Sequence, residues 1–581
     1  MKDKNLLILL RAWLWLRRQM QPTEAQWNLV MAAAVGGTGA VLGLLFRGAT
    51  ITLQQWLTQG HESGVRAFAT LPDWAKLVVP TLGGLVAGLV LLYGHKFFRQ
   101  KNADYMEAIM LGDGKLPIKS SLYRSLAALF SIATGASIGR EGPMVQLAAL
   151  GGSIMGEWRN FPPARRRLIV ASGAAAGIAA AYNAPIAGAL FVSEITVGSL
   201  TMESLGPLIF ASVTSIVTVH IFSDAGPLYR LGSFAMPRPG ELLCFGVLGV
   251  ACGLMAGLFL TMLNYLKKWF QGVPGPLPLR MALGGLAVGI IAMAHPDVTG
   301  NGYEVVKSLV QEKWVWQVVI VTLVAKMLAT SASFGSGAVG GVFTPTLVVG
   351  SCTGFLCWQG FAALFPDLRL DQAGFATIGM GAVLAAATQA PFMSILMIFE
   401  MTLSYEIMIP LMLASVIGYY TFRSLKMHSL YHAAPDAYDL FSRPLETLTV
   451  ADIMQKQPHT VRPEASFGEV ARKFVAGGLD RQYLVGKGGK LLGVVCLEDM
   501  TEHLHSVGLA AAFIAGDIAR ENSPALDPRT PLPEALVKFT HEHEQELPIV
   551  ESGTDRLVGT LSRNDLLLTL AEAGKRGARG R

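Results

Sequence analysis

Charged residues are scarce in this chain. Only 15% of its 581 residues are Asp, Glu, Lys or Arg, whereas 52% are hydrophobic. A soluble protein carries about 25% charged residues, so this deficit excludes an ordinary soluble protein and indicates a chain that crosses a membrane several times. Apolar runs are frequent from about residue 28 to about residue 425, and they stop there.

Cysteine is also rare, and its five copies lack the spacing of a metal site or of a disulfide framework. Nothing resembles a nucleophile with its base, or a P-loop, so we expect no enzyme, no metal and no required cofactor. The apolar start of the chain has no small-residue cleavage site, and Arg11 follows it directly. Residues 1–24 therefore predict a cytoplasmic amphipathic helix at the membrane surface, not a signal peptide.

The formal net charge of +6 comes from basic clusters that flank apolar segments. These clusters are Arg11 with Arg17 and Arg18, then Arg165–Arg167, then Arg423 with Lys426, and finally the tail 574–581. Basic residues collect on the cytoplasmic side of membrane helices, so the charge indicates membrane topology and contact with lipid, not nucleic-acid binding. We expect both termini in the cytoplasm and the protein in the cell inner membrane.

A charged break, Gly139-Arg140-Glu141-Gly142-Pro143, interrupts the apolar sequence. An acid between apolar helices is tolerated in a bilayer where it lines a cavity, pairs or performs a function. Pro143 suits the start of a helix, which would place Glu141 at the positive end of a half-helix aimed into the membrane. Proteins hold anions at mid-membrane in this way, so the break predicts an anion pathway.

The membrane part also repeats itself. Ala181–Pro185 is followed by Glu194, and Ala387–Pro391 is followed by Glu400, each glutamate nine residues after the proline. A second break, Gly340–Pro345, matches Gly139–Pro143. Gly/Pro breaks in corresponding places are typical of a channel or transporter built from two related halves around a mid-membrane site. The expected halves are roughly 25–225 and 240–431.

The texture of the sequence changes after the transmembrane domain, 25–431. A linker over 432–448 leads to two β-α-β-β-α units, expected at 449–508 and 513–573. The expected helices are Phe467–Val475, Glu498–His505, Leu532–Thr540 and Asn564–Ala573, and the expected strands are Gln482–Val485, Leu491–Val495, Glu546–Val550 and Leu557–Leu561.

Together these motifs resemble the CLC family of chloride channels and chloride/proton antiporters, followed by a tandem pair of CBS domains. The motifs that carry the resemblance are Gly139–Pro143, Gly341–Pro345, the two Ala-x-x-Ala-Pro elements, Gly335–Gly337, Gly300–Tyr303 and Tyr431. The resemblance implies a polytopic α-helical membrane protein with two inverted halves, a cytosolic α/β CBS pair, and a homodimer with one pore per subunit.

The resemblance also implies roles for single residues. Glu141 would be the gate, because its ionised carboxylate can take the place of chloride or another small anion at a helix N-terminus. The anion would be bound by backbone N–H groups of Val342 and Phe343, by the Tyr431 hydroxyl, and near Arg140. The alternatives are a Glu141 that merely pairs with Arg140 or with a helix end, core packing for Phe343, and a membrane-interface position for Tyr431.

Two positions depart from the family pattern. Ala103 stands where the family has an anion-binding serine, which leaves the selectivity of the pore open. Glu194 is followed by Ile195, where many antiporters carry a second acid that hands protons inward. Isoleucine carries no proton, so the sequence favours passive conduction. Glu194 and Glu400 themselves are expected to cap helices or to pair, with proton transfer as the alternative.

The CBS pair carries its own candidate site. CBS pairs bind adenine nucleotides, and an aspartate at the end of Gly-x-x-Ser/Thr-x-x-Asp holds the ribose. Gly559–Asp565 fits this pattern with Ser562, whereas the earlier stretch ending at Asp499 has Cys496 in the hydroxyl position. An aspartate that opens a helix is also an ordinary cap, so a purely structural module is the alternative.

Three functions compete on this reading. The first is a chloride channel of the inner membrane, gated by Glu141 on the external side and regulated by ATP or another adenine nucleotide. The second is a proton-coupled anion antiporter. The third is a nucleotide-sensing membrane receptor whose anion pathway is vestigial.

Overall fold

The computed structural model describes residues 24–58, 60, 64–98, 104–110, 112–197, 202–223, 226, 228–229, 238–368, 370–425, 427, 429–430, 448–456, 458–477, 481–496, 513–520, 523–542, 546–563 and 565–566. The chain divides into two units, Met1–His432 and Ala433–Arg581. We describe each unit by itself. The N-terminal helix expected over 1–24 and the linker expected over 432–448 lie almost entirely outside the described residues.

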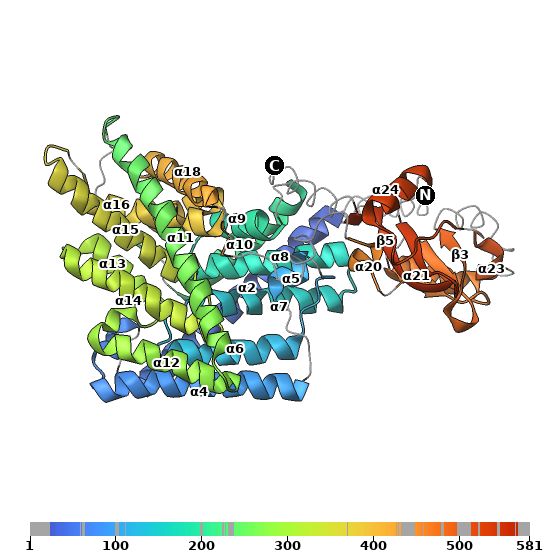
Figure 1. Cartoon of the computed structure of the whole chain (residues 1–581), viewed down its shortest axis with the longest axis horizontal. Helices are drawn as coiled ribbons and strands as arrows, with labels where there is room; N and C mark the ends of the chain where they lie inside the picture. The colour runs from blue at the N-terminus through green and yellow to red at the C-terminus, as the bar shows by residue number, and fades with distance from the viewer. Residues whose placement is uncertain are drawn as a thin grey trace, which may run out of the picture. The chain divides into compact units, whose positions relative to one another are not determined.

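The first unit is a bundle of helices (Figure 1). In chain order they are α2 (Glu24–Thr58), α3 (Val65–Ala69), α4 (Asp73–Phe98), α5 (Tyr105–Met110), α6 (Ile118–Ala133), α7 (Glu141–Trp158), α8 (Pro163–Tyr182), α9 (Pro185–Phe191), the π-helical turn η1 (Val192–Val197), α10 (Met202–Phe222), α11 (Leu242–Gly272), α12 (Leu277–Ala294), the short turn η2 (Pro296–Val298), α13 (Tyr303–Gln311), α14 (Trp316–Gly335), α15 (Phe343–Leu364), α16 (Gln372–Thr388), α17 (Pro391–Thr402) and α18 (Met408–Ser424).

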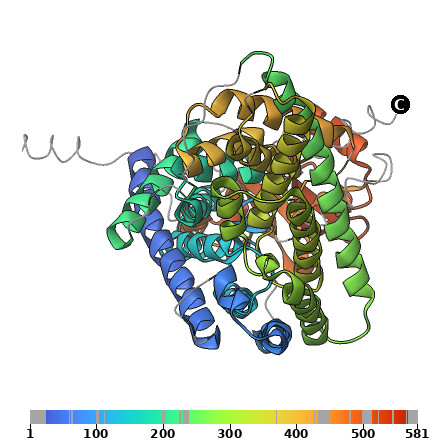
Figure 2. The ribbon, with the colours of Figure 1, turned by 90° about the vertical axis from the view of Figure 1, so that its left-hand side faces the viewer.

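Seven of these helices are long and apolar enough to cross a membrane, namely α2, α4, α10, α11, α12, α14 and α15. Several others are too short to span it, among them α9 and α17, which begin at the repeated prolines. The protein is therefore a multi-pass membrane protein in which short and long helices are combined. Figure 2 looks onto this unit and shows its helices side by side, with α4 at the edge of the bundle.

Small residues bring neighbouring helices into close contact in both halves of the unit. A Cβ atom on Gly152 of α7 would lie 2.7 Å from the Ile169 carbonyl oxygen of α8. A Cβ atom on Gly350 of α15 would lie 2.5 Å from the Gly379 carbonyl oxygen of α16. Such separations exclude any side chain larger than hydrogen, as is usual where membrane helices touch through their backbones. The α7–α8 and α15–α16 pairs thus pack in the same way.

The turns before these pairs also correspond. Gly135 and Gly337 adopt φ angles of 95° and 105°, each in the loop that precedes a Gly/Pro break. Asn183 and Gln389 take left-handed conformations, with φ angles of 55° and 58°, at the ends of α8 and α16. The repeat seen in the sequence is therefore a repeat of backbone conformation.

The second unit contains two small sheets. In the first, β1 (Thr460–Val461) runs parallel to β2 (Arg481–Val485), which pairs antiparallel with β3 (Leu491–Cys496). In the second, β4 (Glu546–Glu551) pairs antiparallel with β5 (Arg556–Ser562). The remaining described elements are α20 (Val450–Ile453), α21 (Phe467–Gly477), the turn η4 (Lys487–Gly489), α23 (Ala515–Ile518) and α24 (Leu532–Glu542).

These elements confirm the four strands and two of the helices expected from the sequence. The other two expected helices cannot be compared: Glu498–His505 lies outside the described residues, as does most of Asn564–Ala573. The first helix of each repeat also packs into the core of the other repeat. Val450 of α20 belongs to the core of Leu532 and Phe539 in the second repeat. Ile518 of α23 belongs to the core of Val470 in the first.

Candidate functional site

The two Gly/Pro breaks of the membrane unit lie side by side. The Gly139 N–H donates to the Gly341 carbonyl oxygen at 2.6 Å, and the Gly341 N–H donates to the Gly139 carbonyl oxygen at 2.9 Å. This antiparallel bridge precedes α7, which begins at Glu141, and α15, which begins at Phe343. The N-termini of two helices, one from each half, therefore meet inside the membrane unit. Both carry partial positive charge, which favours an anion between them.

Glu141 occupies the place where these helices meet. Its side chain is buried, with 2% exposed. The Thr344 hydroxyl donates to Glu141 Oε1, whereas Oε2 accepts no hydrogen bond from any described residue. A Cβ atom on Gly139 would collide with Oε2, and one on Gly341 would lie 3.0 Å from it. Glycine at these positions therefore leaves the space that the carboxylate fills.

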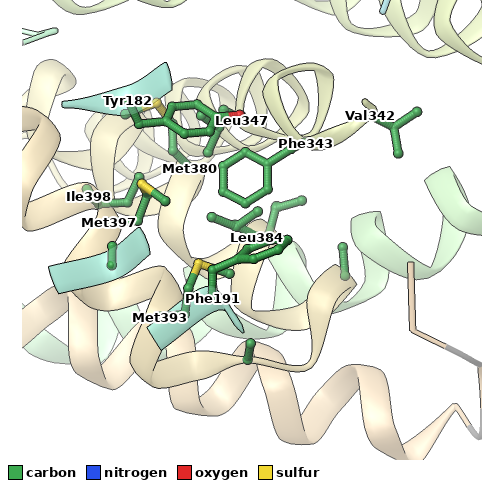
Figure 3. Packing of buried hydrophobic residues seen from close by; sticks show 14 of the residues in the cluster. Tyr182, Phe191, Val342, Phe343, Leu347, Met380, Leu384, Met393, Met397 and Ile398 are labelled. Atoms are coloured by element: carbon green, nitrogen blue, oxygen red, sulfur yellow. The ribbon is translucent and has the colours of Figure 1, made fainter. Parts of the chain in front are cut away.

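Hydroxyl and aromatic groups surround this carboxylate. The hydroxyls of Tyr182 and Thr344 are 3.2 Å apart, which links α8 to α15. Phe343 lies between the rings of Tyr182 and Phe191, at centroid distances of 4.8 Å and 6.2 Å (Figure 3). Phe343 is thus part of the core packing as well as the first residue of α15. Val342, which precedes it, is also buried.

The Arg140 side chain stacks on an aromatic ring. Its guanidinium carbon lies 5.5 Å from the ring centroid of Tyr303, a cation–π contact. It forms no ion pair with Glu141 in the described structure. Tyr303 follows a loop that is fixed by Lys326, whose Nζ donates to the carbonyl oxygens of Val298 at 2.9 Å and Gly300 at 2.8 Å.

The two ends of α2 show which residues of the site lie near which face of the membrane. Near the start of α2, Asn28 Oδ1 accepts a hydrogen bond of 2.6 Å from Arg165 Nε. Just after its end, the Val65 N–H donates to Glu304 Oε2 at 3.1 Å. Because α2 is long enough to span the membrane, Arg165 and Glu304 lie near opposite faces. Tyr303, next to Glu304, therefore lies toward the face opposite the basic cluster.

Glu194 and Glu400 cap helices across the two halves. Glu400 Oε1 and Oε2 accept from the N–H groups of Ile186 and Ala187 in α9, at 2.9 Å and 2.8 Å. Glu194 Oε2 accepts from the Met393 N–H in α17 at 2.8 Å, and its Oε1 accepts from the Phe392 N–H at 3.4 Å. The expectation that these glutamates are caps is confirmed, with each half capping a helix of the other.

The remaining expected membrane residues are distributed as follows. Ile195 lies in η1, partly exposed and next to Glu194. Ala103 and Tyr431 lie outside the described residues. The residues before Tyr431 are held at the end of α16, where the Leu430 N–H donates to the Ala387 carbonyl oxygen at 2.8 Å. The structure therefore brings together Glu141, Arg140, Val342 and Phe343.

Four residues at this site were missed by the sequence reasoning, namely Tyr182, Tyr303, Lys326 and Thr344. Thr344 and Tyr182 stand inside motifs that the sequence singled out, so their hydroxyls were available as a signal. Lys326 had a weaker signal, as a lone cation within an apolar run. Among the described residues no group of three His, Cys, Asp or Glu side chains is placed to hold a metal ion.

In the second unit, Ser562 is the last residue of β5, and Asp565 lies just beyond it. The backbone of Gln455 pairs with Thr560 in β5, and Gln455 Nε2 donates to Asp565 Oδ2 at 3.4 Å. The start of the first repeat thus lies next to the candidate site of the second repeat. Asp499 lies outside the described residues.

Comparison with known proteins agrees with this architecture. The family model described as "Voltage gated chloride channel" matches residues 83–423, and the CBS domain model matches 450–506 and 515–572. A chloride channel protein of Ralstonia nicotianae described as ClcB-like is 48% identical over 411 residues, which cover 70% of this chain and 96% of the relative. The voltage-gated ClC-type chloride channel ClcB of Escherichia coli is 38% identical over 410 residues, covering 70% and 97%.

Solved structures share the fold. A slow cyanobacterial Cl⁻/H⁺ antiporter is 27% identical with a TM-score of 0.62, over 70% of this chain and 96% of that chain. A eukaryotic CLC transporter is 16% identical with a TM-score of 0.62, over 93% and 97%. This chain belongs to the CLC family of voltage gated chloride channels and carries a tandem pair of CBS domains.

Proposed function

We propose that this protein is a chloride channel of the cell inner membrane whose pathway is closed by the carboxylate of Glu141. The observation that carries the proposal is the burial of that carboxylate where α7 and α15 begin, with one oxygen unpartnered among the described residues. A carboxylate and a chloride ion suit the same environment of helix N-termini, so they compete for it. Chloride displaces the side chain, or protonation removes its charge, and the pathway opens.

The N-terminus of α15 supplies the anion-binding groups in this proposal. The backbone N–H groups of Val342 and Phe343 lie at the first turn, where N–H groups have no intrahelical acceptor. Arg140 adds positive charge on the same side as Tyr303. Tyr431 donates its hydroxyl from the cytoplasmic side, and Ala103 leaves this chain without the usual serine hydroxyl.

Passive conduction is the proposed mode of transport, because Ile195 provides no proton carrier beside Glu194. A proton-coupled antiporter is the second candidate. It is supported by the likeness to the cyanobacterial Cl⁻/H⁺ antiporter, which is 27% identical to this chain. The two modes differ in whether protons move in the direction opposite to chloride.

The test uses purified full-length protein in liposomes. Chloride efflux and proton uptake are recorded together under a chloride gradient without an applied voltage. If the protein is a channel, chloride leaves as soon as an ionophore shunts the membrane potential, and no protons move with it. Proton entry in a fixed ratio to chloride exit would show that the protein is an antiporter and not a channel. If Glu141→Ala leaves the chloride flux unchanged, Glu141 is not the gate.

The membrane topology and subunit state form part of the same proposal. Both termini are cytoplasmic, since the basic cluster at the start of α8 and the basic tail would share that side. Two copies of the chain form a homodimer with one pore in each subunit. Cross-linking of the reconstituted protein tests the dimer.

We also assign adenine nucleotide, such as ATP, to the CBS pair at Ser562 and Asp565. The support is the position of Asp565 just beyond β5, with its carboxylate in reach of the Gln455 side chain. Asp499 marks the corresponding place in the first repeat. Calorimetric titration of the full-length protein with ATP, compared with Asp565→Ala, tests this assignment; equal heats for both proteins would contradict it.

A further inference from the structure

Two tyrosine hydroxyls lie buried close to Glu141 without hydrogen bonds. Neither the hydroxyl of Tyr229 nor that of Tyr303 has a partner among the residues that the structure describes. The Tyr229 side chain is only 2% exposed. Buried hydroxyls nearly always find a partner, because an unpaired donor loses its hydrogen bonds with water on folding. Two of them together therefore point to a group that arrives in another state of the protein.

The two tyrosines are held in place from different parts of the chain. Tyr303 begins α13, and the loop before it is fixed by Lys326. Tyr229 lies between α10 and α11, and its N–H donates to the Met401 carbonyl oxygen at 3.0 Å. Their ring centroids are 6.4 Å apart at an interplanar angle of 48°. The pair is thus a fixed feature of the wall around the gate.

The charges around the pair favour an anionic group. Tyr229 interacts electrostatically with Glu141 and with Tyr303. Tyr303 interacts with Glu141, with Arg140 and with Arg47 of α2. Its ring centroid lies 6.4 Å from that of Tyr182, whose hydroxyl contacts Thr344. Glu141 is thus an acidic neighbour of both tyrosines. The two tyrosines therefore lie between the carboxylate of Glu141 and the cations Arg140 and Arg47, both of which interact with Tyr303.

We propose that the hydroxyls of Tyr229 and Tyr303 form the dock that receives the Glu141 carboxylate when it leaves its place beside Gly139 and Gly341. The inference rests on the proposed role of Glu141 as the gate. In the closed state Oε1 is held by Thr344. In the open state the carboxylate accepts hydrogen bonds from the two tyrosines, and the helix N-termini are left to the permeating anion.

This dock gives the two sets of hydroxyls opposite effects on the gate. Hydrogen bonds from hydroxyls to a carboxylate are stronger than those between neutral groups, so each set stabilises the state in which it binds. Thr344 stabilises the closed state, and Tyr229 with Tyr303 stabilises the open state. The balance between them sets the fraction of time that the pathway is open.

The test compares Tyr229→Phe, Tyr303→Phe and the double variant with the parent protein in liposomes. Each substitution removes one oxygen and keeps the ring. We expect each to lower chloride flux about tenfold, the usual effect of losing one hydrogen bond to a charged group. The same substitutions are then made in a Glu141→Ala background, where we expect them to leave the flux unchanged because no carboxylate needs a dock.

The outcomes separate the dock from the gate. If the phenylalanine variants also lower flux in the Glu141→Ala background, the hydroxyls serve the permeating anion or the fold, and the dock is wrong. If Glu141→Ala raises flux but the phenylalanine variants equal the parent, the dock is again wrong while the gate stands. If Glu141→Ala changes nothing, the gate itself fails. Thermal melting identifies variants that act through unfolding. Tyr182→Phe is the matched control: the Tyr182 hydroxyl contacts Thr344 on the closed side of the gate, so its removal is expected to raise chloride flux.

Discussion

Thr344 of α15 donates its hydroxyl to the carboxylate of Glu141, the first residue of α7. The two residues come from different halves of the membrane unit, so the contact joins the two helix N-termini at the point where the anion pathway is proposed to close. The first prediction concerns this hydrogen bond.

Replacing Thr344 by Val removes the hydroxyl and keeps the shape of the side chain. The carboxylate then loses the hydrogen bond that Thr344 donates to it in the closed state, so the gate opens more often. We expect chloride flux to rise about tenfold, the usual effect of losing a hydrogen bond to a charged group. Thr344→Ser keeps the hydroxyl and serves as the control. Flux in Thr344→Val equal to that of Thr344→Ser would contradict the prediction.

Gly139 offers a second way to displace the carboxylate. A methyl group at this position would occupy the space of Glu141 Oε2, whereas a methyl group on Gly142 would come no closer than 3.4 Å to its nearest neighbour. We therefore expect Gly139→Ala to raise chloride flux and Gly142→Ala to resemble the parent. Chloride efflux from liposomes measures both. Equal effects of the two substitutions would show that the space beside Gly139 has no part in closure.

The crossed caps predict an order of stability. Glu400 accepts two short hydrogen bonds from α9, whereas Glu194 accepts one short and one long bond from α17. We expect Glu400→Ala to destabilise the membrane unit by about 2 kcal/mol, near the upper end for the loss of a cap, and Glu194→Ala by less. Glu406→Ala, at an exposed position, is the control. Thermal melting in detergent gives the ranking, and the reverse order would count against it.

Replacing Lys326 is expected to lower the stability of the membrane unit more than removing either cap does. Its side chain is fully buried, and its ammonium group binds two carbonyl oxygens of the loop before Tyr303. Lys326→Met leaves both oxygens buried and unpaired, which costs about 3 kcal/mol. Lys326→Arg keeps a donor and should recover part of the stability. Melting temperatures of the two variants test the prediction, which fails if Lys326→Met is as stable as Lys326→Arg.

In the CBS unit, Tyr483 joins the two sheets. Its hydroxyl donates to Glu546 Oε1 at 2.9 Å, and burial, followed by the charge of Glu546, raises the pKa of Tyr483 above its ordinary value of 10.0. A raised pKa in the folded state gives stability that is present below pH 10 and is lost as the pH rises further. We expect Tyr483→Phe to lower the stability of this unit by about 1 kcal/mol at neutral pH, measured by urea unfolding.

The alkaline limb supplies the second half of that test. The parent protein should lose stability as the pH rises above 10, and Tyr483→Phe should lose less, because it has no hydroxyl to ionise. A parent and variant with parallel alkaline profiles would show that Tyr483 does not carry the effect. Glu546→Gln, which keeps an acceptor without the charge, separates the hydrogen bond from the charge.

Some parts of the structure could be predicted because they repeat. The match between Gly139–Pro143 and Gly340–Pro345 indicated a paired site, and the structure joins these breaks through Gly139 and Gly341. The glutamates after each Ala-x-x-Ala-Pro element were expected as caps. Their partners were not foreseen, because a cap within the same half fits the sequence equally well.

Other parts depend on contacts that no local pattern contains. Tyr229 comes from a segment far from Glu141 in the sequence, and only packing brings it near the tyrosine that ends the Gly300–Tyr303 motif. Lys326 likewise reaches the loop before Tyr303 through the fold alone. Thr344 stands within a motif whose backbone N–H groups are the expected anion ligands, and nothing in the sequence indicates that its hydroxyl reaches Glu141 in the other half. Patterns thus located the helix N-termini, whereas the hydroxyls around them required the fold.

The crossed caps of Glu194 and Glu400 also bear on how the protein is made. A chain is synthesised from the N-terminus onward, so contacts between the first half and the second form only after the second has been made. When the ribosome has completed only the first half, Glu194 has no α17 to cap, and α9 waits for Glu400. The pathway that Glu141 is proposed to guard can take shape only after the second half has entered the membrane, so an unfinished chain cannot leak anions through it.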